Sequence, residues 1–307
     1  MYETQEVDME IYKPSLENIG QLKKYLGYNK YFGCELTAAN NILWSEFYDT
    51  GFVIVEDMLS YCKVKDGKPV AFTFPIGEHN PKKAFDKLCK ELVDSGLEPT
   101  FYLVHPEMFA QIEEWYPEKY KIEYSRDEAD YLYEYKTLSE LKGKKLHGKR
   151  NHINRFEENF PDYMFEEIDD SNYEECIEMA YNWERDNNPD GEADKLYERN
   201  IIEKALKNRE NLGLTGGLIR VDGRVIAFTL GEPINDRCFV VHFEKAYSDI
   251  QGAYPMINRE FVRRMLKGYK YINREEDLGI PGLRHAKTSY QPIRLVEKGT
   301  VTGTAPI

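Results

Sequence analysis

Polar side chains of the kinds that catalyse reactions or bind charged substrates gather in the last third of this 307-residue chain. Residues 239–245 alternate as a strand does, which places His242 and Glu244 on one face. A His-x-Glu spacing also occurs in zinc deaminases, but the Pro-Cys-x-x-Cys segment that completes their site is missing, so no metal is expected. Taken alone, this face fits a polar edge strand as well as a catalytic site.

A second polar segment, residues 249–255, follows directly and reads as a loop that opens a helix. Its small residues leave backbone N–H groups accessible at the positive end of the helix, which favours a phosphate or a carboxylate. We therefore expect Gln251, Gly252 and Ala253 to contribute to binding an anionic group.

A third polar segment, residues 273–292, starts where a short strand ends. Four consecutive charged residues at a strand end are often only a solvated surface. The segment continues, however, through a stretch in which Arg284 and Lys287 share a face if it is helical. The residues of this segment that we expect at a site are Asn273, Glu275, Asp277, Arg284, Lys287 and Tyr290.

The cationic charge of the chain is concentrated in residues 142–155, which hold four Lys, two Arg, two His and no acidic residue. The flanking parts of the chain are both acidic, with net charges of −11 and −8. Such a run fits a solvated linker, but Ile153 and Phe156 interleave with its cations, which favours a helix with one buried and one cationic side. We expect this helix to bind phosphate or another anion through Lys149, Arg150 and Arg155.

The elements that must position these groups are clearest in the second half of the chain. The spacing of apolar residues predicts helices near 170–181, 193–210 and 255–267, and strands near 214–221, 224–232, 238–244, 269–273 and 293–301. This order indicates a mixed α/β arrangement rather than a doubly wound parallel sheet.

The first half has a similar predicted order of strands and helices, and one short sequence segment, called the echo below, occurs in both halves. Residues 66–74 and 222–230 align without gaps, and each reads as a hairpin that turns at Asp-Gly. Such hairpins are common, so the echo leaves duplication and coincidence open. In the first half we expect strands near 52–56, 59–65, 69–76, 100–104, 120–125 and 130–136, and helices near 81–95 and 106–115. We divide the chain into an N-terminal domain (1–141), a basic linking helix (142–160) and a C-terminal domain carrying the site (161–307).

The overall composition argues against several classes of protein. Acidic residues number 54 against 41 Lys and Arg, a net charge of −13, so a surface that coats DNA is not expected. Five widely spaced cysteines without a Cys-x-x-Cys indicate neither a disulfide framework nor a zinc site. The chain begins without the apolar segment of a signal peptide and has no run of roughly 18 apolar residues, so we expect a cytoplasmic protein without a transmembrane segment.

The motifs of the second half and the linking segment together point to one family. They are Asp222-Gly223-Arg224, His242-x-Glu244-Lys245-Ala246, Gly252-Ala253-Tyr254, Asn273-Arg274-Glu275-x-Asp277-x-Gly279, Gly282-Leu283-Arg284-x-x-Lys287-x-Ser289-Tyr290-x-Pro292 and residues 149–156. With them the sequence resembles the phosphatidylglycerol lysyltransferase C-terminal domain family, most specifically over 142–299. The resemblance implies two tandem GNAT-like domains, each a mixed twisted sheet flanked by helices, related to the Fem aminoacyl and peptidyl transferases.

The resemblance also implies an activity. Members fused to a membrane region transfer an amino acid from aminoacyl-tRNA to a lipid, so we expect transfer of an aminoacyl or acyl group from an anionic donor to a hydroxyl or amine acceptor. The family suggests aminoacyl-tRNA, held partly through residues 142–155, whereas GNAT-like folds in general suggest acyl-CoA. No tightly bound cofactor is expected. The acceptor, a small molecule or a lipid, stays open.

Acyl transfer needs a base for the proton of the nucleophile and hydrogen-bond donors for the developing oxyanion. We expect Glu244 or Asp277 to be the base, with Arg284 or Lys287 balancing charge and backbone N–H groups of 252–254 binding a phosphate or the oxyanion. The alternative is a catalytically inactive GNAT-like ligand-binding or interaction module, against which the unbroken polar run from 273 to 290 argues. We also expect four further residues to bind the donor or the substrate: His242, Asn273, Glu275 and Tyr290.

Overall fold

The computed structural model describes residues 9–304, which divide into two compact units. Unit 1 takes in described residues of 1–30, 44–126 and 297–307, and unit 2 takes in 31–43 and 127–296. Each unit combines segments that are separated in the sequence, whereas the expected domains are continuous. All the candidate site residues, from Lys149 to Tyr290, belong to unit 2.

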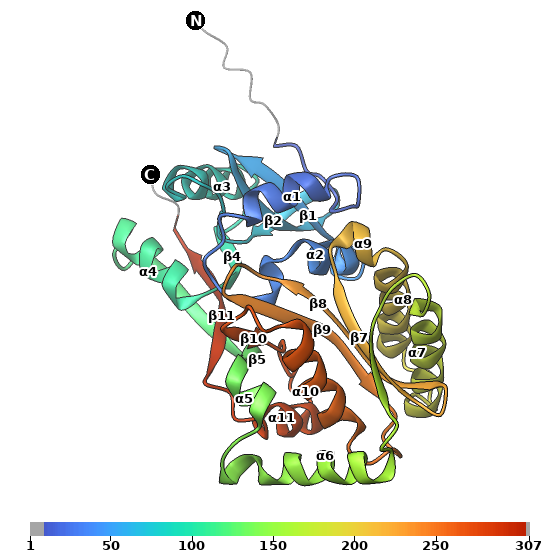
Figure 1. Ribbon diagram of the computed structural model, residues 1–307. Coiled ribbons are helices and arrows are strands. Elements are labelled where there is room, and N and C mark those ends of the chain that lie inside the picture. The colour runs from blue at the N-terminus through green and yellow to red at the C-terminus, as the bar shows by residue number, and fades with distance from the viewer. Residues whose placement is uncertain (1–8, 305–307) are drawn as a thin grey trace, which may run out of the picture. The chain divides into compact units, whose positions relative to one another are not determined.

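Unit 1 is built on a mixed sheet with helices packed on it (Figure 1). Its strands are hydrogen-bonded in the order β1-β2-β3-β4-β11-β5. Stacked rings of Phe85 on α3 and Phe101 on β4, with centroids 4.3 Å apart, fix a helix against the sheet. The elements are α1 (Ile19–Leu26), β1 (Thr50–Val55), β2 (Met58–Lys65), β3 (Lys68–Phe72), α3 (Lys82–Asp94), β4 (Thr100–Val104), α4 (Pro106–Trp115), and parts of β5 (Tyr120–Glu134) and β11 (Arg294–Gly303).

The strands of unit 2 are hydrogen-bonded in the order β5-β10-β9-β8-β7-β6, and β5 therefore belongs to both strand orders of a single 11-stranded sheet. Helix α10 packs on β7, β8 and β9 because Ile257 and Phe261 recur at helical spacing and are buried, while Arg263 is exposed. The elements are η1 (Cys34–Leu36), α2 (Ala38–Trp44), α5 (Tyr135–Glu140), η2 (Lys144–Leu146), α6 (His147–Asn159), β6 (Met164–Glu167), α7 (Tyr173–Asn187), α8 (Ala193–Lys207), α9 (Arg209–Leu212), β7 (Thr215–Val221), β8 (Arg224–Pro233), β9 (Cys238–Ala246), α10 (Ala253–Met265), β10 (Tyr271–Asn273) and α11 (Pro281–Thr288).

The two echo segments form matching hairpins, one in each unit. Asp66-Gly67 joins β2 to β3 and Asp222-Gly223 joins β7 to β8, and all four turn residues have positive φ, from 49° to 78°. Two residues at positive φ make the turn whose twist matches that of the strands. Each hairpin also has a register shift at the same distance before its turn. The shift lies between Lys63 and Val64 in the first hairpin and, 156 residues later, between Ile219 and Arg220 in the second. This shared irregularity favours duplication over coincidence, because a hairpin does not require it.

Each unit also contains a parallel strand pair joined by a helix. β3 pairs with β4 through α3, and β9 pairs with β10 through α10. Parallel neighbours need such a crossover, because both strands must start from the same edge. The expected mixed α/β class, with twisted mixed sheets flanked by helices, is confirmed.

Several predicted boundaries differ from the structure. The strands expected at 120–125 and 130–136 are one strand, β5, because the charged residues between them include no Gly or Pro to end it. The short helices α1 and α2 were not among the expected elements. Short elements carry too few periodic residues to be recognised in one sequence.

Helix α6 lies within the segment in which a basic linking helix was expected. Its apolar residues Ile153 and Phe156 are buried, and the helix contacts α10. The cations Lys144, Lys145 and Arg155 on and just before it are exposed. The segment therefore has the expected buried side and cationic side.

Candidate functional site

A pocket of about 380 Å³ lies where α6 passes the start of α10. It gathers four of the residues expected to bind the donor, Lys149, Gln251, Gly252 and Ala253. The loop that leads from β9 to α10 forms most of its wall, because it turns back over α6 there. The other residues that line it are His152, Tyr247, Ser248, Asp249, Ile250, Tyr254 and Pro255.

Gly252 is required where the pocket wall meets α6. Its φ is +89°, a conformation that favours glycine, and a Cβ built on it lies 2.3 Å from the carbonyl oxygen of His152. Gly252 is also the residue that precedes α10, and the first three residues of α10 line the pocket. The backbone N–H of Ala253 donates to the carbonyl of Ile250 at 3.1 Å, and Pro255 has no N–H. The close approach of two backbones therefore explains both the glycine and the shape of the pocket.

Lys149 connects this pocket with a second group of polar residues. Its Nζ lies 4.1 Å from the ring centroid of Tyr290, which is itself buried. Burial, together with the positive charge of Arg274, lowers the pKa of Lys149. The guanidinium of Arg274 lies 4.7 Å from the same ring centroid. Lys149 and Arg274 thus both lie close to Tyr290.

The second group is a buried ion pair between β9 and the residue after β10. Arg274 Nη2 donates to Glu244 Oε1 at 2.8 Å, and Asn258 Nδ2 on α10 donates to Glu244 Oε2 at 3.0 Å. The side chains of Glu244 and Arg274 are only 9% and 12% exposed, and Asn258 is 1% exposed. Burial of this kind is costly unless every polar atom is paired.

Two atoms of this group have no hydrogen-bond partner. Arg274 Nη1, a donor, and Asn258 Oδ1, an acceptor, are both buried. Neither residue was among the expected site residues, although Arg274 lies within the family motif. Asn258 could have been found as a polar residue at a buried position of an otherwise apolar helix face.

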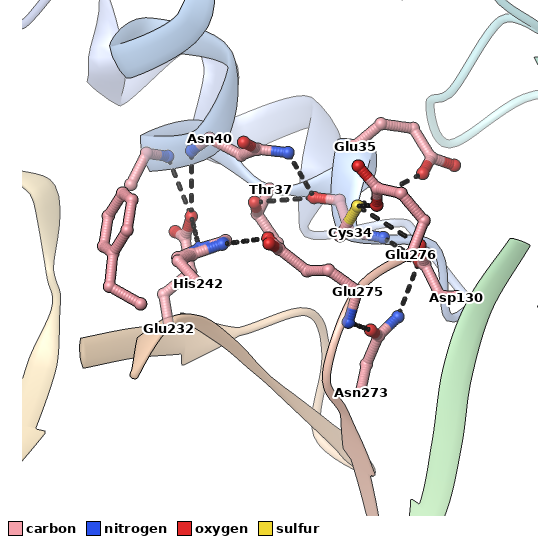
Figure 2. Close-up of polar contacts among 12 residues, drawn as sticks. Cys34, Glu35, Thr37, Asn40, Asp130, Glu232, His242, Asn273, Glu275 and Glu276 are labelled. Carbon is pink, nitrogen blue, oxygen red and sulfur yellow. Dashed lines mark hydrogen bonds and ion pairs between the residues drawn. The ribbon is translucent and has the colours of Figure 1, made fainter. Parts of the chain in front are cut away.

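His242 and Glu275 are brought together, but in a different arrangement (Figure 2). His242 Nδ1 lies 2.8 Å from Glu275 Oε1, and Nε2 lies 3.1 Å from Glu232 Oε1. Burial opposes the charged imidazole, but the two carboxylates outweigh it and raise the pKa of His242 to about 10. Glu232 also accepts the backbone N–H of Ala39 and of Asn40, so this cluster holds the start of α2.

Asn273 belongs to a neighbouring group that contains possible metal ligands. Its Nδ2 donates to Asp130 Oδ2 at 2.8 Å, and that oxygen also accepts the backbone N–H of Cys34. Ligand atoms of Cys34, Asp130 and Glu276 lie within 4.8 Å of one another (Figure 2). The Lys287 ammonium donates to the Glu276 carbonyl, and burial lowers the pKa of Lys287. The Lys287 ammonium therefore lies close enough to Glu275, Glu276 and Asp130 for their charges to act on it.

Asp277, which is buried, and Arg284, which is partly exposed, form a third arrangement. Arg284 Nε and Nη2 donate to Asp277 Oδ2 and Oδ1 at 2.9 and 2.7 Å, and Tyr131 Oη donates to Oδ2. The backbone N–H of Gly279 also donates to Oδ1, and the Asp277 side chain is fully buried. These contacts fix the turn between β10 and α11.

Two predicted basic residues lie outside the pocket lining. Arg150 donates to the carbonyls of Leu141 and Gly143, at the end of α5, and Arg155 is exposed on α6. The structure therefore brings Lys149, Glu244 and Tyr290 close to the α10 pocket, and it places His242, Asn273 and Asp277 in separate buried clusters.

Comparison with known proteins agrees with this architecture. A crystal structure of a conserved protein of unknown function from Bacteroides thetaiotaomicron has 38% identity and a TM-score of 0.89, and the match covers 96% of this chain and all of that one. The C-terminal domain of a candidate lysylphosphatidylglycerol synthetase from Agrobacterium fabrum has 13% identity and a TM-score of 0.64, over 93% and 91% of the two chains. A tandem GNAT protein from the clavulanic acid biosynthesis pathway matches 98% and 99% of the two chains, with 10% identity and a TM-score of 0.46.

A curated relative and a family pattern complete the comparison. An uncharacterised protein of Mycoplasmoides gallisepticum is 26% identical over 193 residues, a match that spans 60% of this chain and 60% of the length of that relative. The pattern of the family described as phosphatidylglycerol lysyltransferase, C-terminal, matches residues 29–300. That range is most of the chain, so the protein belongs to the phosphatidylglycerol lysyltransferase C-terminal family.

Proposed function

We propose that this chain is an acyltransferase that takes an aminoacyl or acyl group from an anionic donor bound at the α10 pocket. The observation that carries the proposal is the position of Lys149, which lines the pocket and contacts Tyr290 beside the buried Glu244–Arg274 pair. Acyl transfer needs a site for the negative charge of the donor and a base for the proton of the nucleophile. Here a helix start suited to anions and a buried carboxylate lie on either side of one lysine. Family membership supports the same class of reaction.

In this mechanism the nucleophile of the acceptor attacks the carbonyl carbon of the donor. Glu244 takes the proton of the nucleophile and passes it to the leaving oxygen or sulfur of the donor as the bond from that atom to the carbonyl carbon breaks. Lys149 and the positive end of the α10 dipole stabilise the negative charge on the donor and on the carbonyl oxygen. We assign Asp277 a positioning role, because its carboxylate accepts four hydrogen bonds, from Arg284, Tyr131 and Gly279, whereas each oxygen of Glu244 accepts one.

The donor is proposed to be aminoacyl-tRNA, with acyl-CoA as the competing candidate. The exposed cations Lys144, Lys145 and Arg155 favour tRNA, because a long polyanion can contact cations that lie outside the pocket lining. Acyl-CoA, by contrast, would bind in the pocket without contacting these exposed cations. The acceptor is proposed to be a hydroxyl or amine of a lipid or small molecule. Among residues 9–304, no helix combines the length and apolar character that crossing a bilayer requires.

The donor is tested by measuring binding of aminoacyl-tRNA and of acetyl-CoA at about 50 and about 200 mM salt. Lys149→Met is the test variant, and Lys145→Met, an exposed lysine of the same basic segment, is its matched control. For tRNA we expect steep salt dependence and weaker binding by both variants, since each lost phosphate contact lowers the slope by about one. For acetyl-CoA we expect weak salt dependence and an effect of Lys149→Met alone. Unchanged binding by Lys149→Met for both donors would refute the site.

The transfer step is tested with labelled donor and Glu244→Gln. We expect donor affinity to stay within a few-fold and transfer to fall by roughly 10²–10⁴-fold, the usual contribution of a general base. Thermal melting confirms that the variant is folded, because Gln keeps one acceptor for Arg274 or Asn258. Binding of both donors by wild-type protein without any acyl transfer to lipid or amine acceptors would favour the inactive binding module instead.

A further inference from the structure

A second pocket, of about 320 Å³, lies in unit 2 between the later part of α10 and the chain that leads from α6 to β6. Three arginines, two glutamates and one tyrosine line it: Arg259, Arg263, Arg264, Glu157, Glu260 and Tyr163. None of these residues lines the pocket at the start of α10. The lining carries three positive and two negative charges, a net charge of +1, so this pocket suits an anion better than a cation.

One buried carboxylate holds all three arginines of this pocket. Glu260 Oε1 accepts from Arg259 Nε at 3.0 Å and from Arg263 Nη1 at 3.4 Å. The other oxygen, Oε2, accepts from Arg264 Nε at 2.8 Å. Arg259 also donates through Nη2 to Glu157 Oε1 at 2.6 Å, so it is bound by both glutamates of the lining. Glu260 therefore fixes the guanidinium groups in place before any ligand arrives.

Arg263 and Arg264 have donors left for a ligand. Arg263 bonds to Glu260 through Nη1 and Arg264 through Nε, which leaves further N–H groups on each guanidinium. The Arg264 guanidinium also lies 5.2 Å from the ring centroid of Phe165, which limits its movement. The side chains of both arginines are 51% exposed, whereas that of Glu260 is 4% exposed. The positive groups, and not the carboxylate that holds them, therefore face the solvent.

A phosphate group matches these donors in charge and in shape. Guanidinium groups bind phosphate oxygens through charge-assisted hydrogen bonds, often two at a time. Tyr163, which interacts with Arg264, adds a hydroxyl to the same pocket. A phosphomonoester has three terminal oxygens, one for each arginine and one for this hydroxyl. A nucleic acid would need a longer run of cations than a pocket with a net charge of +1 offers.

We propose that Arg263, Arg264 and Tyr163 form a binding site for a phosphomonoester group, with Glu260 as the residue that positions the two arginines. This site is separate from the proposed donor pocket, so it takes a second anionic ligand. The phosphate belongs either to a soluble phosphorylated compound or to the headgroup of a phosphomonoester lipid. The competing explanation is a network of surface ion pairs that binds no ligand.

The site is tested by titrating methyl phosphate into wild-type protein at pH 7, where chloride is adjusted to keep the ionic strength constant. NMR signals of the arginine side-chain N–H groups report the binding, which separates this pocket from that of Lys149. We expect a dissociation constant of roughly 1 mM or below, because two charge-assisted hydrogen bonds form. Dimethyl phosphate should bind roughly 10-fold more weakly, because it has one terminal oxygen and one negative charge fewer.

Variants then locate the binding. Arg263→Gln and Arg264→Gln each remove one guanidinium and should weaken the binding of methyl phosphate roughly 10-fold. Lys267→Gln is the matched control, because Lys267 is an exposed cation just beyond the end of α10 that does not line the pocket. It should bind methyl phosphate as wild type does. All three side chains are exposed, so the variants are expected to fold, and thermal melting checks this.

Vesicles distinguish the two sources of the phosphate. Co-sedimentation with phosphatidic acid in phosphatidylcholine, but not with phosphatidylcholine alone, and its loss in Arg263→Gln and Arg264→Gln, would identify a lipid headgroup. Binding of methyl phosphate without co-sedimentation would identify a soluble compound, and both results support the site.

Three results would overturn the site. They are no binding of methyl phosphate, equal binding of dimethyl phosphate, and an equal loss of affinity in Lys267→Gln. Binding of a short RNA in place of methyl phosphate would likewise show that the cations serve a polyanion. None of these results touches the transferase proposal, because that proposal depends on Lys149 and Glu244.

Discussion

Replacing Gly252 with alanine tests whether the close approach of α10 to α6 builds the pocket. The φ of +89° costs an L-residue about 1–2 kcal/mol. The new Cβ would also lie 2.3 Å from the carbonyl oxygen of His152 and 3.0 Å from Cβ of Phe156. Since His152 O is backbone within a helix, the contact is relieved only by moving α6 and α10 apart. Displacements of that kind cost about 1–3 kcal/mol, so we expect a total loss of about 2–5 kcal/mol.

The assay is urea unfolding, with donor binding measured on the folded variant. Gly148→Ala is the matched control. Gly148 lies on α6, the helix whose backbone Gly252 approaches, and a Cβ built on Gly148 meets nothing within 4 Å. In a helix this change is expected to leave stability unchanged or raise it by up to about 1 kcal/mol. Gly252→Ala should in addition weaken donor binding, since the pocket wall shifts with it.

Two results would contradict this account of Gly252. Wild-type stability of Gly252→Ala would mean that the two backbones are not held in contact. Equal losses for both glycines would mean that glycine at α6 and α10 serves flexibility rather than close packing.

Two further predictions concern the buried clusters. The pKa of His242 is raised from 6.5 to about 10, so its stabilising charge is fully present below about pH 6.5 and is lost as pH rises through 10. His242→Gln should cost about 3–5 kcal/mol near pH 7, and urea unfolding should show this gap narrowing toward pH 10; a constant gap would contradict the assignment. Asp277→Asn should cost about 2–4 kcal/mol by weakening the Arg284 pair, yet leave transfer by folded protein nearly unchanged at low temperature. Loss of transfer without loss of stability would make Asp277 catalytic instead.

Local signals in the sequence were sufficient for much of the fold. The Asp-Gly turns were predictable because two successive residues at positive φ restrict the choice of amino acid. Helices α7, α8 and α10 were predictable because each buries a face that repeats at helical spacing. The helix start at Gly252 was predictable because small residues and a proline suited to the first turn precede the apolar repeat of α10.

Long-range partners could not be predicted from local signals. The sequence places Glu244 on a strand but does not reveal that Arg274, 30 residues away, neutralises it. It places His242 and Glu244 on one face, but it cannot show that the first bonds to Glu275 and Glu232 while the second bonds to Asn258 and Arg274. Such pairings depend on sheet order, which non-adjacent segments decide together.

The role of the motif segment 273–290 therefore follows from the hydrogen bonds that each residue makes rather than from the charge of the segment. Asn273 bonds to Asp130 and to the carbonyl of Phe32, and Lys287 bonds to the carbonyl of Glu276. These are contacts within unit 2 that keep the chain after β10 in one conformation. That conformation holds Arg274 against Glu244, because Arg274 immediately follows the last residue of β10. The polar run therefore supports the position of Arg274 over the ring of Tyr290, and the cationic segment brings Lys149 to the same ring.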